Sequence, residues 1–378
     1  MGTKHNTRLL FKIPLLLVIL LLGGLAFSGC RGVATVPKGW SGGIVADDIL
    51  FVGSMEGKLV AVNVSAGSRL WEVLLETPES AGGGFLGCAP ASTAVAIYGS
   101  PAVAGDLVYV GGYNGKIYAF TFGRDEPRWV YPRQGSLGGP IVGGLIVAQG
   151  RVYFGSSDGK VYALDATDGF KEWVFETGDK IWSTPAIDGD TLFIGSFDTK
   201  LYALNATDGS KKWEFETEGA IASTPLVYNN TVYIGSFDRY LYAVDATDGS
   251  LKWKFMAENW FWAKPVVYND TVYAGCLDGK VYALDAESGD KLVEFDLGSP
   301  VSSSPVLVGN LIVVATEEGV VYTLDSDSNR KIQLVSLEEE VYAPLVASQG
   351  VVYIHTAQDV LYAVDARSGA IREFNIGS

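Results

Sequence analysis

Closely spaced aspartates are the side chains in this sequence that could most directly perform chemistry. They occur in successive similar segments, at Asp165, Asp168, Asp245, Asp248 and Asp285. Neighbouring carboxylates can bind a metal ion or act as a general acid and base. Each of these aspartates, however, stands at the same place before a glycine. Because Asp accepts backbone hydrogen bonds at tight corners, the spacing predicts turns rather than a catalytic pair.

Histidine and cysteine offer little alternative chemistry. The two histidines are His5 and His355, so neither a histidine-based catalytic site nor a histidine-rich metal site is expected, and we interpret His355 as packed near a strand. The three cysteines, Cys30, Cys88 and Cys276, are far apart in the sequence, and no C-x-x-C-H haem motif is present. The sequence therefore predicts no metal site and no enzymatic activity.

A fixed repeat organises the elements that carry these residues. One tyrosine recurs every 40 residues, at Tyr162, Tyr202, Tyr242, Tyr282, Tyr322 and Tyr362. Tyr118 holds the same place 44 residues before Tyr162, and Val60 holds it 58 residues before Tyr118. Eight copies of one unit are therefore predicted.

Each unit contains four apolar segments separated by turns. In one unit they are residues 223–227, 231–235, 240–244 and 251–255. Four strands in about 40 residues are typical of a propeller blade. The third segment, such as 161–164, is apolar at every position, so both faces of each sheet must be covered. We predict an all-β fold, an eight-bladed β-propeller of four-stranded antiparallel blades, over residues 40–378.

Tryptophans recur on the fourth segment of the first five units, at Trp71, Trp129, Trp173, Trp213 and Trp253. We expect each indole to pack against the neighbouring blade while its N–H finds a local acceptor. The same position holds Val293, Gln333 and Arg372 in the last three units. Those blades are therefore expected to be held less tightly.

The N-terminus has the pattern of an export signal. Residues 1–12 are basic, residues 13–27 are almost wholly apolar, and small residues lead into Cys30. The segment 25–30 resembles a bacterial lipobox, which implies that residues 1–29 are a lipoprotein signal peptide, that Cys30 is lipidated and that 30–39 is a tether. An uncleaved membrane anchor is the alternative. Either case places the repeats outside the cytoplasm, attached to the membrane.

The charge balance limits the partners. The chain has 28 Lys and Arg against 43 Asp and Glu; without the three basic residues of the first 29 positions, 25 remain against 43, a net charge of −18. Such a surface repels the phosphates of nucleic acids. A nucleic-acid partner is therefore excluded, and a basic partner or plain solubility would account for the charge.

The repeat also resembles a known family. The form S-x-P-x-V, V-Y-x-G-S-x-D-G, Y-A-L-D-A-x-x-G-x-x-x-W, best seen at 183–213 and 223–253, resembles the PQQ-like repeat of quinoprotein-type propellers. Large quinoprotein dehydrogenases of that family clamp PQQ with a disulfide between adjacent cysteines, which this sequence lacks. Its length and lipobox are instead similar to the BamB-type lipoproteins of the outer-membrane β-barrel assembly machinery. No cofactor is then expected.

Departures from the repeat are the candidate functional features. The largest is an insertion at 79–97, which contains Cys88 and has no strand pattern. By up-and-down alternation, this insertion and the turn that holds Cys276 share one face of the propeller. In an exported protein the two cysteines could form a disulfide, or they could be unrelated thiols.

Aromatic residues near the start of the first strands are the second departure. We predict that they gather at the channel mouth as a binding site for a partner or ligand, or that they fill a tapering interior. The candidates are Trp40, Tyr98, Trp182, Trp260, Phe261, Trp262 and Tyr342. Acidic residues in the loops of the same face, such as Glu218 and Glu258, would form a rim around them.

These features together predict a membrane-anchored, extracytoplasmic propeller that acts as a non-enzymatic scaffold. It would be a monomeric propeller within a complex and would bind exported or membrane proteins through its loop face. Two alternatives remain: a protein that binds PQQ, another quinone or a different small ligand, with a redox role, and a binder of cell-wall polysaccharide.

Overall fold

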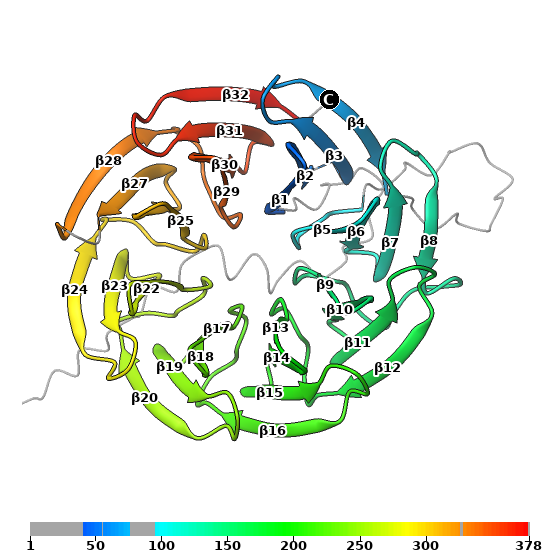
Figure 1. Ribbon diagram of the computed structural model, residues 1–378, viewed down its shortest axis with the longest axis horizontal. Coiled ribbons are helices and arrows are strands. Elements are labelled where there is room, and N and C mark those ends of the chain that lie inside the picture. The colour runs from blue at the N-terminus through cyan, green and yellow to red at the C-terminus, as the bar shows by residue number, and fades with distance from the viewer. Residues whose placement is uncertain (1–40, 55, 76–94, 326–327, 377–378) are drawn as a thin grey trace, which may run out of the picture. The chain divides into compact units, whose positions relative to one another are not determined.

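The apolar segments of the repeat fold into consecutive antiparallel strands. The computed structural model describes residues 41–54, 56–75, 95–325 and 328–376. In this part of the chain the strands form eight sheets, each of four strands that follow one another in the sequence. The sheets stand as blades around a common centre (Figure 1). The predicted all-β, eight-bladed propeller is confirmed.

The strands of blades one to four are β1 (Gly43–Ala46), β2 (Ile49–Gly53), β3 (Lys58–Asn63), β4 (Arg69–Leu74), β5 (Ala102–Ala104), β6 (Leu107–Gly112), β7 (Lys116–Thr121), β8 (Pro127–Tyr131), β9 (Ile146–Ala148), β10 (Arg151–Gly155), β11 (Lys160–Asp165), β12 (Lys171–Glu176), β13 (Ala186–Asp188), β14 (Thr191–Gly195), β15 (Lys200–Asn205) and β16 (Lys211–Glu216).

The strands of blades five to eight are β17 (Leu226–Tyr228), β18 (Thr231–Gly235), β19 (Tyr240–Asp245), β20 (Leu251–Met256), β21 (Val266–Tyr268), β22 (Thr271–Gly275), β23 (Lys280–Asp285), β24 (Lys291–Asp296), β25 (Val306–Val308), β26 (Leu311–Ala315), β27 (Val320–Asp325), β28 (Arg330–Ser336), β29 (Val346–Ser348), β30 (Val351–His355), β31 (Val360–Asp365) and β32 (Ile371–Asn375).

The first strand of each blade is innermost and the fourth is outermost (Figure 1). Strand direction alternates, which defines two faces. We call the side with the turns between second and third strands and the connections between blades, such as 156–159 and 177–185, the upper face. The lower face carries the turns between first and second strands and the corners between third and fourth strands, such as 149–150 and 166–169.

The hydrophobic core lies between neighbouring blades. On β11, Val161, Ala163 and Leu164 have no exposed surface and Tyr162 is 6% exposed, so both faces of this third strand are covered as predicted. Side chains of blade three pack with those of blade four in one cluster, and equivalent clusters follow around the ring. Each blade therefore depends on its neighbours for burial of its apolar surface.

The repeated tryptophans hold adjacent blades together, as predicted. The Trp173 indole N–H donates to the carbonyl of Ala206 in the next blade at 3.0 Å. Gly209 of that blade faces the same indole, and a Cβ there would lie 2.6 Å from the ring. The other equivalent N–H···O pairs are Trp129–Ala166, Trp213–Ala246 and Trp253–Ala286. The glycine that ends each aspartate corner therefore makes room for the tryptophan.

Blade eight is joined to blade one by an arginine in place of the tryptophan. The Arg372 guanidinium donates to the carbonyls of Val64 and Ser65, and Val64 stands at the position of Ala206 in the repeat. Gly67 lies against Phe374 and this arginine, at the place where Gly209 lies against Trp173. At blade eight the arginine therefore supplies a donor in place of the indole N–H, and the weaker hold of the last blades stays a prediction.

Further polar contacts cross the same seam. His355 is 3% exposed, which confirms that it packs at a strand. Its Nδ1 lies 3.0 Å from the Ser41 carbonyl and its Nε2 lies 2.8 Å from Asp359 Oδ1. Gln349 donates to Asp48 at 2.9 Å. Within the described residues, the ring closes through side chains and not by exchange of a strand between the ends of the chain.

Candidate functional site

The predicted aromatic residues lie in the connections that lead into the inner strands. Trp182 precedes β13, Trp260 and Trp262 precede β21, and Tyr342 precedes β29, all on the upper face. Each of these side chains is partly exposed. Trp40 lies outside the described residues. The connections therefore bring most of the candidates to the face that the sequence indicates.

Phe261 corrects the prediction. It occupies the repeat position of Ile181 and Ile221, and it is 1% exposed. Its backbone and side chain pack directly on Gly235 of the preceding blade, where a Cβ would lie 2.4 Å from the Cβ of Phe261. Side chains alternate along this segment, so Phe261 points into the core while its two tryptophan neighbours do not. Phe261 is therefore a core residue rather than part of a binding surface.

A connected aromatic cluster extends across the upper face from blade four to blade six. Trp182 contacts Phe197 with ring centroids 4.7 Å apart, and Phe197 contacts Phe237 at 5.7 Å. Phe237 stacks on Trp260 at 4.6 Å and on Trp262 at 5.4 Å. We call these five residues the aromatic cluster. Three blades contribute rings to one surface.

Sequence reasoning missed two members of this cluster. Phe197 and Phe237 stand in the turns between second and third strands, at a position that holds Ser157, Leu277 and Glu317 in other blades. Tyr113 holds the equivalent position in blade two, so an aromatic ring at this turn position in several blades is the available signal. Without these two residues the three tryptophans would not be connected.

A lysine fixes one end of the aromatic cluster. The Lys180 ammonium lies 4.7 Å from the Trp182 ring centroid and 4.5 Å from that of Phe197. Such contacts favour a cation over an aromatic face. The Trp182 N–H also donates to Ser157 Oγ at 3.1 Å. The orientation of this indole is therefore set by the chain itself.

Tyr98 and Tyr342 make separate contacts in other blades. Tyr98 lies 5.3 Å from the ring of Tyr113, and burial, with a smaller effect of Tyr113, raises its pKa to about 12. Burial also raises the pKa of Tyr342, and the nearby carboxylates of Glu340 and Glu317 act in the same direction. Both tyrosines are therefore neutral at physiological pH.

Carboxylates surround the aromatic cluster on the connections between blades. Exposed acids on this side are Glu176, Asp179, Glu216, Glu218, Glu258, Asp296, Glu338 and Glu340. No ion pair within 4.0 Å joins any of them to a cation of the described chain. Their negative potential is therefore open to an approaching cationic group.

The repeated aspartates have structural roles in turns. Asp165 Oδ1 accepts the backbone N–H of Thr167 at 2.7 Å, and Asp245 Oδ1 accepts that of Thr247 at 2.8 Å, so the predicted aspartate corners are confirmed. Among the described residues, no group of three or more His, Cys, Asp or Glu side chains is placed to hold a metal ion.

None of the described residues belongs to a helix with the length and hydropathy needed to span a bilayer.

Cys276 is enclosed by the protein. It has no exposed surface, and its thiol donates to the Asn259 carbonyl at 3.3 Å. Burial raises the pKa of this thiol strongly, and the nearby Asp278 carboxylate adds to the effect. Cys88 and residues 79–94 of the insertion lie outside the described residues, as does Cys30, so the disulfide and the lipidation stay predictions. Val95 to Ile97 are buried in the core.

The fold and the tryptophan–carbonyl hydrogen bonds between its blades define an eight-bladed propeller of PQQ-like repeats. The chain belongs to the family described as outer membrane protein assembly factor BamB, whose family profile matches residues 38–175 and 157–372.

Solved structures agree with this fold. The crystal structure of BamB from Moraxella catarrhalis is similar with 21% identity, a TM-score of 0.66, and coverage of 89% of this chain and 94% of that chain. The computationally designed Ika8 protein is similar with 15% identity, a TM-score of 0.68, and coverage of 90% and 97%. At these identities the likeness shows the fold alone. A comparison with curated proteins found no match.

Proposed function

We propose that this protein is an extracytoplasmic, membrane-anchored scaffold without enzymatic activity, which binds another exported or membrane protein through its upper face. The observation that carries the proposal is the aromatic cluster, on a face whose exposed carboxylates form no ion pair within 4.0 Å in the described chain. Membership of the BamB family supports the scaffold role. The lipobox that ends at Cys30 supports the anchor.

The aromatic cluster has the physical properties of a binding hot spot. Large aromatic side chains supply much contact area for few rotatable bonds, and they dominate the energetics of many interfaces. Contacts of Phe237 with Trp260 and Trp262 already fix these rings in the free protein. A partner therefore orders fewer side chains on binding, which lowers the entropic cost.

The carboxylates select the charge of the partner. An acidic rim attracts basic segments and repels acidic ones, and it accelerates association mainly at low ionic strength. The net charge of −15 for the whole chain acts in the same direction. The partner surface is therefore expected to combine apolar or aromatic side chains with Lys or Arg.

The contacts of Phe237 argue against a flat cofactor at this place. A quinone such as PQQ would need an open aromatic face to stack on. Phe237 already stacks on Trp260 with an interplanar angle of 13° and on Trp262 with an angle of 16°. Phe237 thus occupies one face of each indole, which reduces the ring surface open to a quinone. We therefore assign the upper face to a protein partner rather than to a quinone.

A comparison of two substitutions tests the proposal. The Trp262→Ala variant removes a ring from the aromatic cluster, whereas Phe170→Ala removes an aromatic ring that is 58% exposed at a lower-face corner. The amount of partner that co-purifies after chemical cross-linking should fall at least about tenfold for Trp262→Ala and stay unchanged for Phe170→Ala. Equal capture by both variants, at unchanged melting temperature, would refute the assignment of the upper face.

The membrane anchor is tested separately. The Cys30→Ser variant removes the predicted lipid attachment point, so its intact mass should lack a lipid and it should leave the membrane fraction or keep the signal segment. Treatment of the wild type with globomycin should likewise retain residues 1–29. An unchanged mature mass in both experiments would contradict a lipoprotein and favour an uncleaved anchor.

A further inference from the structure

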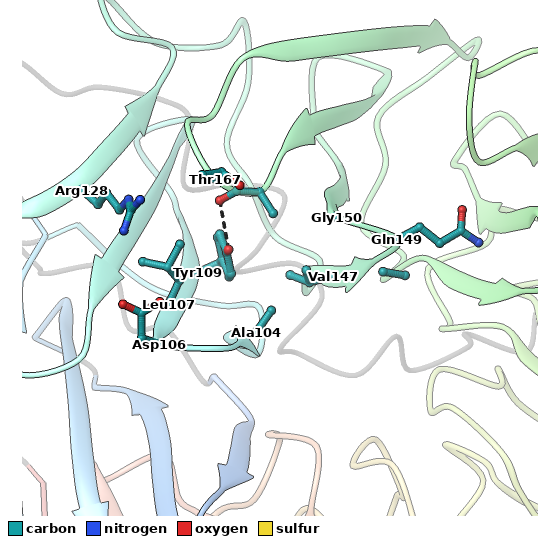
Figure 2. A pocket seen from close by; sticks show the side chains of 11 residues that line it. Ala104, Asp106, Leu107, Tyr109, Arg128, Val147, Gln149, Gly150 and Thr167 are labelled. Atoms are coloured by element: carbon teal, nitrogen blue, oxygen red, sulfur yellow. Dashed lines mark hydrogen bonds between the residues drawn. The ribbon is translucent and has the colours of Figure 1, made fainter.

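A pocket on the lower face lies between blades two and three. Figure 2 shows its lining, in which Asp106 and Arg128 of blade two lie across the Tyr109 ring from Val147 and Gln149 of blade three. Its volume is about 400 Å³. This is within the range of pockets that hold small ligands.

The floor of the pocket is rigid. The Tyr109 hydroxyl donates to the Ala166 carbonyl at 3.0 Å, and the Trp129 indole N–H donates to the same oxygen at 3.1 Å. Tyr109 is 1% exposed, and its pKa is raised to about 12, first by burial and then by Asp106. The hydrogen bonds to the Ala166 carbonyl that hold the two blades together therefore also preform the pocket.

The equivalent cations of blades four and five are held by hydrogen bonds within the chain. Lys212 donates to Asp190 at 2.6 Å and to Thr191 at 2.7 Å. Lys252 donates to Thr231 at 2.8 Å in the same way. In these blades, a hydroxyl at the start of the second strand holds the cation of the outer strand against its own blade.

Blade two differs from blades four and five. Leu107 stands at the position of Thr191 and Thr231, and its apolar side chain cannot accept a hydrogen bond from Arg128. Arg128 and Asp106 are both exposed, and no ion pair within 4.0 Å joins them in the described structure. A cation and an anion are thus left open on the rim of one preformed pocket.

The accessible space continues past Arg128. An adjoining hollow of about 530 Å³ shares Arg128 and Thr167 with the first and is also lined by Arg133 and Asp168. The Arg133 guanidinium lies 4.4 Å from the ring centroid of Phe170. The two hollows together are thus lined by two arginines and two aspartates, without an excess of either sign.

We propose that this pocket binds a small zwitterionic ligand, a short peptide or amino acid whose carboxylate contacts Arg128 and whose ammonium contacts Asp106. A guanidinium binds a carboxylate through two parallel hydrogen bonds, and charge-assisted hydrogen bonds are about twice as strong as neutral ones. The apolar side chains of Leu107 and Val147 supply contacts for the uncharged part of the ligand. This site is separate from the upper face and does not depend on the scaffold role.

Titration with a dipeptide and its blocked forms tests the proposal. The probes are L-alanyl-L-alanine, its N-acetyl form without the ammonium and its amide without the carboxylate, with binding followed by NMR shifts of the propeller. L-alanine alone tests whether a single amino acid suffices. Saturable binding of the dipeptide is expected, with each blocked form at least about tenfold weaker. Absence of saturable binding in the millimolar range, or equal affinity for all three dipeptide forms, would overturn the proposal.

Substitutions of the two charged side chains test which charge of the ligand each one contacts. In Asp106→Asn, acetylation of the dipeptide should no longer weaken binding, whereas in Arg128→Gln, amidation should no longer weaken it. The matched control is Lys212→Gln in blade four, where the equivalent cation is paired with Asp190. This control should bind like the wild type, and all three variants should keep the wild-type melting temperature because the side chains are exposed or lie on the outer strand. Loss of binding in the control to the same extent would also overturn the proposal.

Discussion

Arg372 at the junction of blades eight and one allows a sharp test of how the ring is closed. The Arg372→Met variant keeps an apolar stem near Phe374, whose ring centroid lies 4.8 Å from the guanidinium, but removes both hydrogen bonds to the carbonyls of blade one. A hydrogen bond to a charged group contributes about 1.5–3 kcal/mol when buried. Arg372 is exposed, so we discount the pair to about 1–2 kcal/mol in total.

The expected change in melting temperature follows from the size of the unit. Unfolding entropy is about 2.1 cal/mol/K per residue, or about 0.7 kcal/mol/K for a unit of about 340 residues. Arg372→Met should therefore lower the melting temperature by about 1.5–3 °C in scanning calorimetry. Arg372→Trp should restore it, because tryptophan makes the equivalent bond at four other junctions.

The control makes the same chemical change elsewhere. Arg330 begins the outer strand β28 and is also exposed, so Arg330→Met should leave the melting temperature within about 0.5 °C of the wild type. An equal effect of both methionine substitutions, or a lower melting temperature for Arg372→Trp than for Arg372→Met, would refute the argument that a donor at this position closes the ring.

Three further outcomes follow from the same structure. Trp213→Phe removes the N–H bond to Ala246 and replaces the buried indole with a smaller ring, so the free energy of unfolding should fall by at least about 1 kcal/mol in denaturant titration. No change would contradict the role of this tryptophan between the blades. Cys276 is buried with a raised pKa, so its thiol should react with a thiol reagent at pH 8 only after unfolding; fast reaction of the native protein would show that it is accessible. The pKa of Tyr98 is raised to about 12 in the folded state from about 10, so its contribution to stability is complete below pH 10 and is lost as the pH rises toward 12. Phenolate absorbance at 295 nm should show that Tyr98 ionises after the exposed tyrosines. Ionisation of Tyr98 at pH 10 would contradict its burial.

The sequence predicts the propeller well because its evidence is periodic. The 40-residue step of the tyrosines, the aspartate corners and the tryptophans all report the same structural unit. The structure shows equivalent strand pairing within successive blades and an equivalent tryptophan–carbonyl bond at four junctions. The contacts of Arg372 cannot be predicted in the same way, because an isolated position does not reveal that arginine donates to the carbonyl that tryptophan reaches in other blades. A loss of the usual residue is not a loss of its hydrogen bond.

The binding surface is harder to predict because it depends on side-chain direction. Trp260, Phe261 and Trp262 are adjacent in the sequence, yet only the middle residue points into the core. Phe197 and Phe237 belong to turns far from those residues in the sequence and meet them only in the folded ring. The pocket at Arg128 depends on a single leucine in another strand, a relation that no local pattern shows.

Site-specific photo-cross-linking at position 237 tests the central claim, that the aromatic cluster on the upper face binds a protein partner, most directly. A benzoylphenylalanine side chain replaces Phe237 in one version of the protein and Phe170, on the lower face, in another. We predict one discrete adduct with an exported or membrane protein from position 237 and none from position 170. Absence of an adduct at position 237, or the same adducts from both positions, would contradict the account.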